Sequence, residues 1–370
     1  MKIAGGEKIG SENVSTTIYM LTKDLDFTGV TYNAKRAAFT GVLNGLGHTV
    51  SNVTLEGTKT DTGLFYRVAG GTIMNIKFNN IRITSNSSRT GIVASAYGGY
   101  FHNIAITNLS IQAAERTGGL IGQVFDGQTA LEITRVSLIN PIPKLTSQGR
   151  IAEGQNQSDL YYISSSAHRV AGIIGFIQAQ STMTGTIEIK VEDCYVESYI
   201  WTASHTVSSI VGEFDENGHR ASALLRGAEY ALSIKNCVSA GVLISTGSSG
   251  RIGGMLGYHK ALGALTISSC IAIHDMYYSD VKLATSQKNQ SPIIGNFNDA
   301  ANADVSRCYA LMEEYNSNYN VTVYTPNDFA IPDLYGNTSF NFRTTWQFIF
   351  EDESEETLQR PYLGLRFQEV

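Results

Sequence analysis

One short pattern of apolar and polar positions recurs along this chain. An apolar residue is followed by two free positions, then an apolar residue or Cys, one free position, and a small or apolar residue. The middle position of the pattern is occupied in turn by Val53, Ile76, Ile104, Val136, Cys194, Cys237, Cys270 and Cys308. Because the middle and last positions are two residues apart, their side chains share one face of a β-strand. The recurrence predicts a repeat fold with this strand in every unit.

The positions around the middle residue keep their character from repeat to repeat. The position three residues earlier is hydrophobic throughout, with Val50, Ile73, Phe101, Ile133, Val191, Ile234, Ile267 and Val305. The position two residues later is small or apolar, with Leu55, Phe78, Ile106, Leu138, Val196, Ser239, Ala272 and Ala310. The position directly before the middle residue is polar, with Asn52, Asn75, Asn103, Arg135, Asp193, Asn236, Ser269 and Arg307. We expect the hydrophobic columns to face a core, and the polar column to serve turns or hydrogen bonds along a stack rather than catalysis.

A second, glycine-rich pattern lies between these strands. It reads TGLF at 62–65, TGIV at 90–93, GGLIG at 118–122, AGIIG at 171–175, SSIVG at 208–212, GGMLG at 253–257 and SPIIG at 291–295. Glycine permits tight bends and a close approach between backbones. The intervals between middle positions vary from 23 to 58 residues, which suits a coil with insertions better than propeller blades or helical solenoids. The sequence therefore predicts an all-β fold, a single-stranded right-handed parallel β-helix (β-solenoid) of about eight coils with capped ends.

The four cysteines of the chain all occupy the middle column, in successive repeats. Coils stacked about 4.8 Å apart place these thiols side by side inside the core, where a free thiol behaves as a small hydrophobic group. A disulfide between neighbouring coils would be strained, because the two side chains run parallel. We therefore expect reduced, buried cysteines rather than disulfides.

A stack of coils needs covers at both ends, since an exposed terminal coil presents unpaired backbone groups and bare core. We assign residues 1–49 to an N-terminal lead-in and cap, residues 50–315 to the repeats, and residues 316–370 to a C-terminal cap. This last segment lacks the repeat and carries several aromatic residues. The longest interval contains the polar, turn-rich segment 141–169, which we predict to be a lateral loop.

The glycine-rich pattern resembles the signature of the bacterial GLUG-motif repeat proteins, which consists of glycine, leucine, an apolar residue and glycine. GGLIG and GGMLG match this signature directly. YMLTKDLDF at 19–27 and RPYLGL at 360–365 are similar to the opening and closing segments of that family. The resemblance implies a β-helix or β-solenoid of bacterial surface proteins and adhesins, in which the repeats are generally not the catalytic part. Resemblance in fold alone does not assign an activity.

Charge and hydropathy exclude two classes of partner. The net charge is −6 at pH 7 and the Lys and Arg residues are dispersed, so we expect no nucleic-acid partner. No run of about eighteen apolar residues exists, so we expect no membrane insertion. The first ten residues contain no apolar signal core, which is weak evidence about location because a processed or replaced start would look the same.

β-Helices also host polysaccharide lyases and glycoside hydrolases, which need carboxylates, or a carboxylate and a base, clustered on one outer face. Here the candidate pairs diverge, because Glu192 and Asp193 are adjacent, as are His274 and Asp275, and adjacent strand residues point to opposite faces. The seven histidines show no HExxH or His-x-His spacing, and the sequence contains no EF-hand loop. We therefore assign no catalytic residue, metal or cofactor, and favour a non-catalytic protein over an enzyme.

Aromatic residues of the later repeats are the candidate binding residues, namely Tyr195, Tyr199, Trp201, Tyr277, Tyr278 and Tyr309. Planar rings on a rigid sheet can stack on sugar rings, while their hydroxyl or indole groups donate hydrogen bonds. The same residues also suit ordinary strands, because Tyr and Trp favour β structure.

These observations lead to three hypotheses. The first is a non-catalytic module for adhesion or receptor recognition, whose partner is a glycan or a host surface receptor. The second is a polysaccharide-degrading β-helix enzyme, and the third is a purely structural spacer. We expect an extracellular or cell-surface location, or alternatively a virion, and a monomer, or a trimer if the chain is a phage tail appendage. Binding residues could lie on the strands, on the 141–169 loop or at a trimer seam.

Overall fold

The computed structural model describes residues 17–30, 32, 36–57, 60–86, 88–125, 129–178, 186–215, 229–260, 263–283, 289–297, 303–311, 321–324, 346–349 and 362–365. Within these residues the chain forms three stacked sheets, here called sheets A, B and C, and a small antiparallel pair. The pair is made by β35 (Trp346–Ile349) and β36 (Tyr362–Leu365).

Sheet A has nineteen strands: β1 (Ile18–Met20), β2 (Leu25–Asp26), β4 (Val42–Asn44), β5 (Thr49–Gly57), β8 (Thr72–Ser85), β11 (Gly99–Ala113), β14 (Leu131–Ile139), β15 (Tyr162–Ser165), β18 (Thr186–Glu192), β19 (Tyr195–Thr202), β22 (Glu229–Lys235), β23 (Val238–Ser245), β26 (Ala264–Ser268), β27 (Ile271–Ala272), β28 (Asp275–Tyr278), β29 (Val281–Lys282), β32 (Ala303–Ser306), β33 (Cys308–Leu311) and β34 (Val321–Tyr324). Sheet B has eight: β3 (Ala38–Phe39), β7 (Phe65–Ala69), β10 (Val93–Tyr97), β13 (Ile121–Phe125), β17 (Ile174–Gln178), β21 (Val211–Asp215), β25 (Leu256–His259) and β31 (Ile294–Phe297). Sheet C has seven: β6 (Asp61–Thr62), β9 (Arg89–Thr90), β12 (Arg116–Gly118), β16 (Arg169–Ala171), β20 (Thr206–Ser208), β24 (Arg251–Gly253) and β30 (Gln290–Ser291). Among the described residues, one 3-10 turn, η2 (Gln157–Asp159), lies between β14 and β15.

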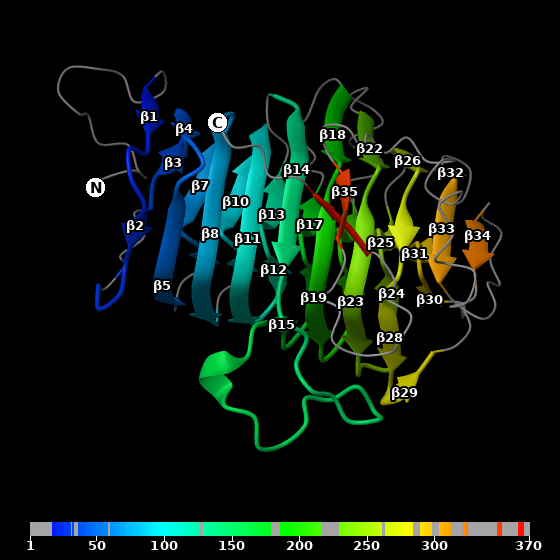
Figure 1. Cartoon of the computed structure of the whole chain (residues 1–370). Coiled ribbons are helices and arrows are strands. Elements are labelled where there is room, and N and C mark those ends of the chain that lie inside the picture. Colours follow the sequence, from blue (N-terminus) through cyan, green and yellow to red (C-terminus); the bar gives the residue numbers. More distant parts are fainter. Residues whose placement is uncertain are drawn as a thin grey trace.

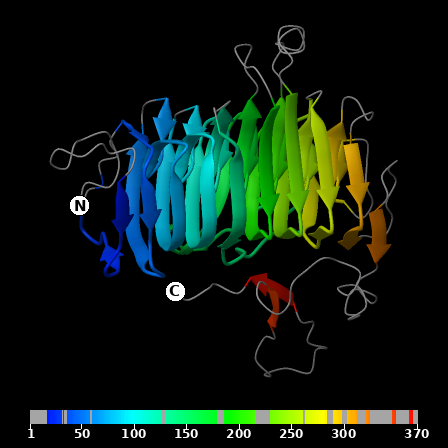
Figure 2. The same ribbon diagram turned by 90° about the horizontal axis from the view of Figure 1, so that it is seen from above.

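The chain passes through sheets A, C and B in turn, and each coil pairs in parallel with the next. In Figure 1 the strands of sheet A run down the front while the coils advance from left to right, which makes the helix right-handed. Figure 2 shows the same coils from above as one elongated stack. The eight strands of sheet B agree with the expected eight coils, so the predicted parallel β-helix is confirmed. Among the described residues, no helix is long and apolar enough to cross a membrane.

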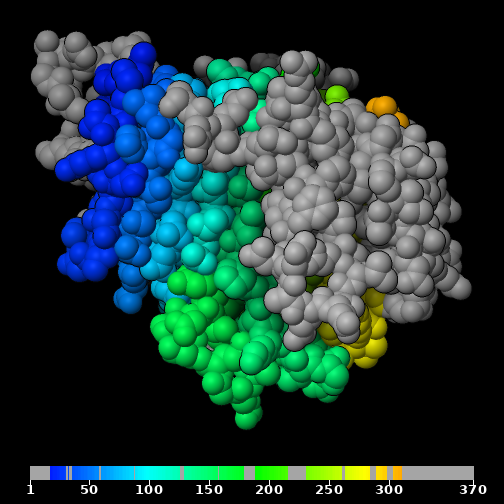
Figure 3. All heavy atoms as spheres, in the orientation of Figure 1, coloured from blue at the N-terminus to red at the C-terminus, as the bar shows by residue number. Residues whose placement is uncertain are grey.

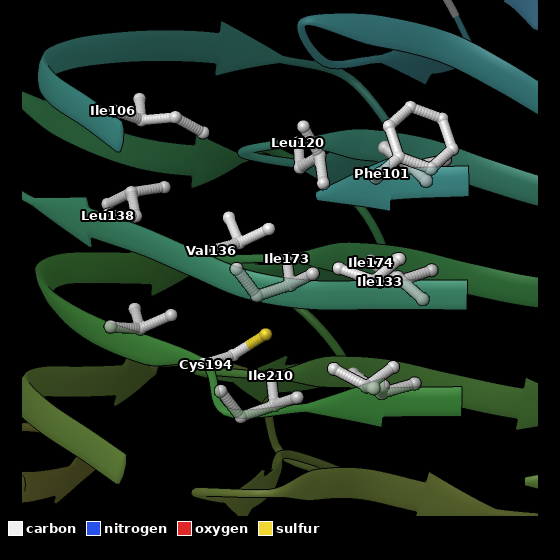
Figure 4. Close-up of a cluster of buried hydrophobic side chains, with 14 of the residues drawn as sticks. Phe101, Ile106, Leu120, Ile133, Val136, Leu138, Ile173, Ile174, Cys194 and Ile210 are labelled. Carbon is white, nitrogen blue, oxygen red and sulfur yellow. The ribbon is translucent and has the colours of Figure 1, made fainter. Parts of the chain in front are cut away.

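The interior of the stack is filled by the predicted apolar columns. Phe101, Ile133 and Val191 lie in consecutive paired strands of sheet A, and each is fully buried. Figure 4 shows the same stacking for Val136 above Cys194. Complete burial of one such side chain stabilises the fold by about 1.5–3 kcal/mol, so the shared columns, rather than any single contact, hold the coils together.

The four cysteines are buried and free, as predicted. Each thiol donates a hydrogen bond to the carbonyl oxygen two residues earlier, as Cys270 Sγ does to Ser268 O at 3.4 Å. Burial raises the pKa of the Cys237 thiol. The Cys237 thiol is therefore a neutral core group.

The predicted register is wrong for the first repeat. Val53 pairs with Ile81 in β8, not with Ile76, and Val50 pairs with Phe78, not with Ile73. Leu55 accordingly pairs with Ile83. The apolar pattern occurs twice within β8, once around Ile76 and again around Ile81, and the first coil aligns with the second occurrence.

The polar column turns the chain at a corner of each coil. All eight predicted residues have φ between 51° and 59°, the left-handed region that Asn tolerates better than other non-glycine residues. The asparagines also bond along the stack, since Asn103 Nδ2 donates to Asn75 Oδ1 at 2.9 Å and Asn80 Nδ2 donates to Asn52 Oδ1 at 2.7 Å. The expected turn-forming role is confirmed.

The glycine-rich pattern marks the bend between sheets C and B. A Cβ atom on Gly118 would lie 1.9 Å from Ile121 O, and one on Gly122 would lie 2.6 Å from Thr90 N. Any larger side chain would push the two strands apart, so the glycines are required by the close backbone approach.

The stacking extends beyond both assigned boundaries of the repeats. β4, inside the predicted lead-in, already pairs in parallel with β8, and β34, inside the predicted cap, continues sheet A after β33. The β35–β36 pair lies along the outer side of sheet A, where β36 contacts β14 (Figures 1 and 2). Residues 1–16, 31 and 33–35 of the predicted lead-in, and the residues of 316–370 outside β34, β35 and β36, lie outside the described part of the chain.

Candidate functional site

The segment between β14 and β15, residues 140–161, forms a lateral loop, which is shorter than the predicted 141–169 because Tyr162–Ser165 form the strand β15. It protrudes at the lower edge of the molecule in Figures 1 and 3. An antiparallel bridge joins Leu145 to Ile151, and Ala152 N donates to Lys144 O at 2.8 Å, so the tip is a short hairpin-like turn. The loop is therefore an ordered element, with hydrogen bonds of its own.

Contacts with Arg82, Tyr199 and Asp280 help to attach the lateral loop to sheet A. The guanidinium of Arg82 in β8 lies 4.4 Å from the centre of the Tyr161 ring and donates to Leu160 O at 3.2 Å. The hydroxyl of Tyr199 in β19 donates to Gly149 O at 3.2 Å. Arg150 Nε donates to Asp280 Oδ1 at 2.8 Å. The loop thus spans the sheet from the strand β8 to the β28–β29 turn.

A pocket of about 470 Å³ lies between this loop and sheet A. Its walls come from neighbouring coils of the sheet and from the loop, and they are formed by Gln112, Arg150, Ile151, Tyr162, Ser164, Tyr199, Trp201, Ile244 and Thr246. This volume falls within the range of small-ligand sites, and aromatic walls with a few polar groups are typical of such sites.

The alternation of the strands explains why these side chains meet. In β19 the side chain of Ile200 is fully buried in the core, so Tyr199 and Trp201 on either side of it face outward. Tyr199 pairs with Tyr162 of the preceding coil, and Trp201 pairs with Ile244 of the following one. Because the coils pair in register, outward residues that are two positions apart in one strand lie beside outward residues of the neighbouring coils and together form one patch.

The rings of this patch pack against each other and against the loop. Tyr162 and Tyr199 are arranged edge to face, with ring centres 6.2 Å apart and an interplanar angle of 83°. Tyr199 is buried, whereas Tyr162 and Trp201 remain half-buried and line the pocket. Burial raises the pKa of both tyrosines, so their hydroxyls are neutral donors.

The remaining predicted residues lie elsewhere. Tyr277 is 6% exposed and lies under Gly149, so it supports the loop without lining the pocket. Tyr278, on the opposite face of β28, packs against the main core and donates its hydroxyl to Ser248 O at 2.9 Å. Tyr195 and Tyr309 are 1% and 6% exposed, so their rings offer no free face to a ligand. The pocket therefore contains two of the six predicted residues, Tyr199 and Trp201.

Arg150 supplies the only charged side chain among the residues that line the pocket. Asp280 holds this guanidinium with two hydrogen bonds, and the same bonds lower the pKa of the Asp280 carboxyl. The lining residues include no Asp or Glu, so they contain no carboxylate pair of the kind that cleaves glycosidic bonds. Their chemistry is that of stacking, hydrogen bonding and binding of an anion.

His274, Asp275 and Glu192, which the sequence offered as possible catalytic groups, each have a structural partner. Ser239 Oγ lies 2.8 Å from His274 Nδ1 inside the core, while Asp275 on the other face pairs with Lys282 at 2.9 Å. Glu192 lies 3.9 Å from Lys235 of the next coil. Within the described ranges, no group of three His, Cys, Asp or Glu side chains is arranged to hold a metal ion.

Comparison with known proteins gives little further information. No protein-family model and no curated protein matches the sequence. Among solved structures, the chain is similar to the one described as a "putative immunoglobulin A1 protease from Bacteroides ovatus". The two share 14% sequence identity with a TM-score of 0.49, over 80% of this chain and 78% of that chain. At this level the likeness does not bear on activity.

Proposed function

We propose that the protein is a non-catalytic recognition module that binds a glycan in the pocket beneath the lateral loop. The observation that carries the proposal is the position of Trp201 and Tyr162, two half-buried aromatic residues of neighbouring coils that line one pocket. Sugar rings present apolar faces that stack on such side chains, and their hydroxyl groups exchange hydrogen bonds with polar neighbours. Gln112, Ser164 and Thr246 supply these neighbours.

The rigidity of the site supports binding. The aromatic residues stand on strands that pair with a coil on each side, so little conformational entropy is lost when a ligand binds. The resemblance of GGLIG and GGMLG to the GLUG-motif repeat proteins leads us to propose the same family here. Within this proposal the module acts in adhesion at a bacterial surface or on a virion, with a glycan or a host surface receptor as its partner.

Binding to an array of capsular and plant oligosaccharides, followed by calorimetry on the glycans retained, tests the proposal. We expect Trp201→Ala to weaken binding about tenfold or more, because the lost stacking and burial amount to roughly 1.5–3 kcal/mol. Tyr100→Ala is the matched control, since Tyr100 is a half-buried aromatic residue of the same sheet outside the pocket. Equal loss in both variants, or no loss in either, would remove the pocket from consideration.

The competing enzymatic function is tested with the same glycans. A reducing-end assay on each retained glycan should show no release of new ends over hours. Sustained turnover that Trp201→Ala abolishes would replace the recognition module with a polysaccharide-degrading enzyme.

A further inference from the structure

The orientation of Arg150 points to one class of sugar. Its Nε atom and one terminal nitrogen both bond Asp280, which fixes the plane of the guanidinium, and Arg150 lines the pocket. The side chain nevertheless remains 62% exposed. A guanidinium has five N–H donors, and a carboxylate that bonds one edge leaves others available.

We propose that the pocket selects sugars that carry a carboxylate, such as uronic or sialic acids, and that Arg150 holds this carboxylate. The inference rests on the proposed glycan binding. Arg150 is the only charged side chain among those that line the pocket, and it is paired with Asp280 behind it, so a ligand carboxylate would bond the guanidinium N–H groups that Asp280 does not occupy. Trp201 and Tyr162 hold the ring of the sugar, and Arg150 recognises its acidic group.

The role of Asp280 follows from the backbone of its turn. Ser279 and Asp280 both have positive φ, 48° and 67°, which is the conformation of a tight two-residue turn between β28 and β29. The turn presents the carboxylate of Asp280 to the loop and thereby fixes a long, otherwise flexible Arg side chain. An Arg whose orientation is fixed in this way loses less entropy when it binds a ligand.

The experiment uses three probes, the trimers of galacturonate, glucuronate and α2,8-linked sialate, each compared with its methyl ester. The ester keeps the shape of the sugar and removes only its charge. We expect at least one acid trimer to bind at least about tenfold more tightly than its ester, which corresponds to one charge-assisted hydrogen bond. The acid should lose affinity as NaCl rises, and the ester should not.

Two variants test whether Arg150 causes the preference for the acid over its ester. Arg150→Gln should reduce the ratio of acid to ester affinity to about one. Lys144→Gln, which removes the same charge from an exposed position of the same loop, should leave the ratio unchanged.

The possible outcomes separate the two proposals. Binding of acid and ester with equal affinity, or an acid preference that survives in Arg150→Gln, would overturn the role of Arg150 and leave glycan binding intact. Binding of neutral array glycans alone would do the same. Absence of binding to every glycan of the array would overturn the proposed function itself.

Discussion

The hydroxyl of Tyr199 donates to the carbonyl oxygen of Gly149 at 3.2 Å and joins β19 to the tip of the lateral loop. Fifty residues separate the two in sequence. The bond closes one side of the pocket, because Tyr199 lines it and Gly149 is followed directly by Arg150. The shape of the binding site therefore depends on the position of this loop on sheet A.

Gly149→Ala tests the seating of the loop. A Cβ atom at this position would lie 2.5 Å from the Tyr277 ring, so the tip must move off the sheet. We expect glycan affinity to fall about tenfold or more while the thermal midpoint changes little, because the core columns are untouched. Calorimetry and differential scanning measure the two quantities.

Gly154→Ala is the control for this substitution. Gly154 has φ +81°, close to the +78° of Gly149, but a Cβ atom there has no neighbour within 4 Å. Both variants thus carry the same backbone strain, and only one carries the steric clash. If Gly154→Ala weakened binding as much, backbone strain rather than the contact with Tyr277 would control the pocket.

Stability should fall in mild acid because of buried histidines. His259 is 1% exposed between Phe214 and Phe297, and burial lowers its pKa to about 4, as it does for His274. In the unfolded chain these rings titrate near 6.5, so between pH 6.5 and 4 the unfolded state binds more protons than the folded state. Acidification from pH 6.5 to 4 should lower the free energy of unfolding by about 3 kcal/mol for each of the two histidines. Above pH 7 neither histidine should make the stability depend on pH.

Urea unfolding at a series of pH values measures this loss. His259→Phe, which continues a column of phenylalanines, should remove about half of the pH dependence and keep the stability at pH 7.5. If the unfolding free energy of this variant depended on pH as in the unchanged protein, carboxylates rather than His259 would cause the loss of stability in acid.

The substitution Arg307→Asn should stabilise the fold. The φ of Arg307 is 51°, the same left-handed conformation in which Asn75, Asn103 and Asn236 turn other coils. Asn tolerates this region better than Arg, so Arg307→Asn should stabilise the fold by about 1 kcal/mol. Arg307→Ala keeps the unfavourable conformation and should give no gain. An equal shift of the urea midpoint in both variants would mean that removal of the arginine side chain, not backbone strain, is responsible.

The fold was predictable because every coil requires similar residue types at equivalent positions. The inward columns recur with each coil, and the glycine pattern recurs with substitutions, since Ala171 and Ser208 occupy the row of Gly118. The spacing of both patterns can be read from the sequence without any long-range information. The error at Val53 arose from this same repetitiveness, since two occurrences of one apolar pattern lie within a single strand. Register within a repeat fold is thus the part that local patterns specify least.

The pocket was only partly predictable, because it depends on contacts between distant residues. The sequence identified Trp201, Tyr199 and the lateral loop separately, but 130 residues separate Arg150 from Asp280. The sequence did contain a sign that Tyr195 and Tyr309 are buried. Val238 and Ile271 occupy the same outward row and are as deeply buried as the two tyrosines. An outward row with this apolar character indicates a covered surface rather than an open binding face.

The register of the later coils has a direct test in two neighbouring residues of β22. Ile234 pairs with Val191 and Ile267 in the inward column and is fully buried, whereas the adjacent Lys235 is exposed and lies 3.9 Å from Glu192. Ile234→Asp places a carboxylate without a partner in a dry stack, which should cost several kcal/mol and cause unfolding or aggregation. Lys235→Asp removes one exposed ion pair and should change stability by only about 0.5 kcal/mol. Soluble yield and thermal midpoint compare the two, and a shift of one residue in the register would exchange the results, because side chains alternate between faces along a strand. Equal tolerance of both substitutions would mean that this segment is not a core strand.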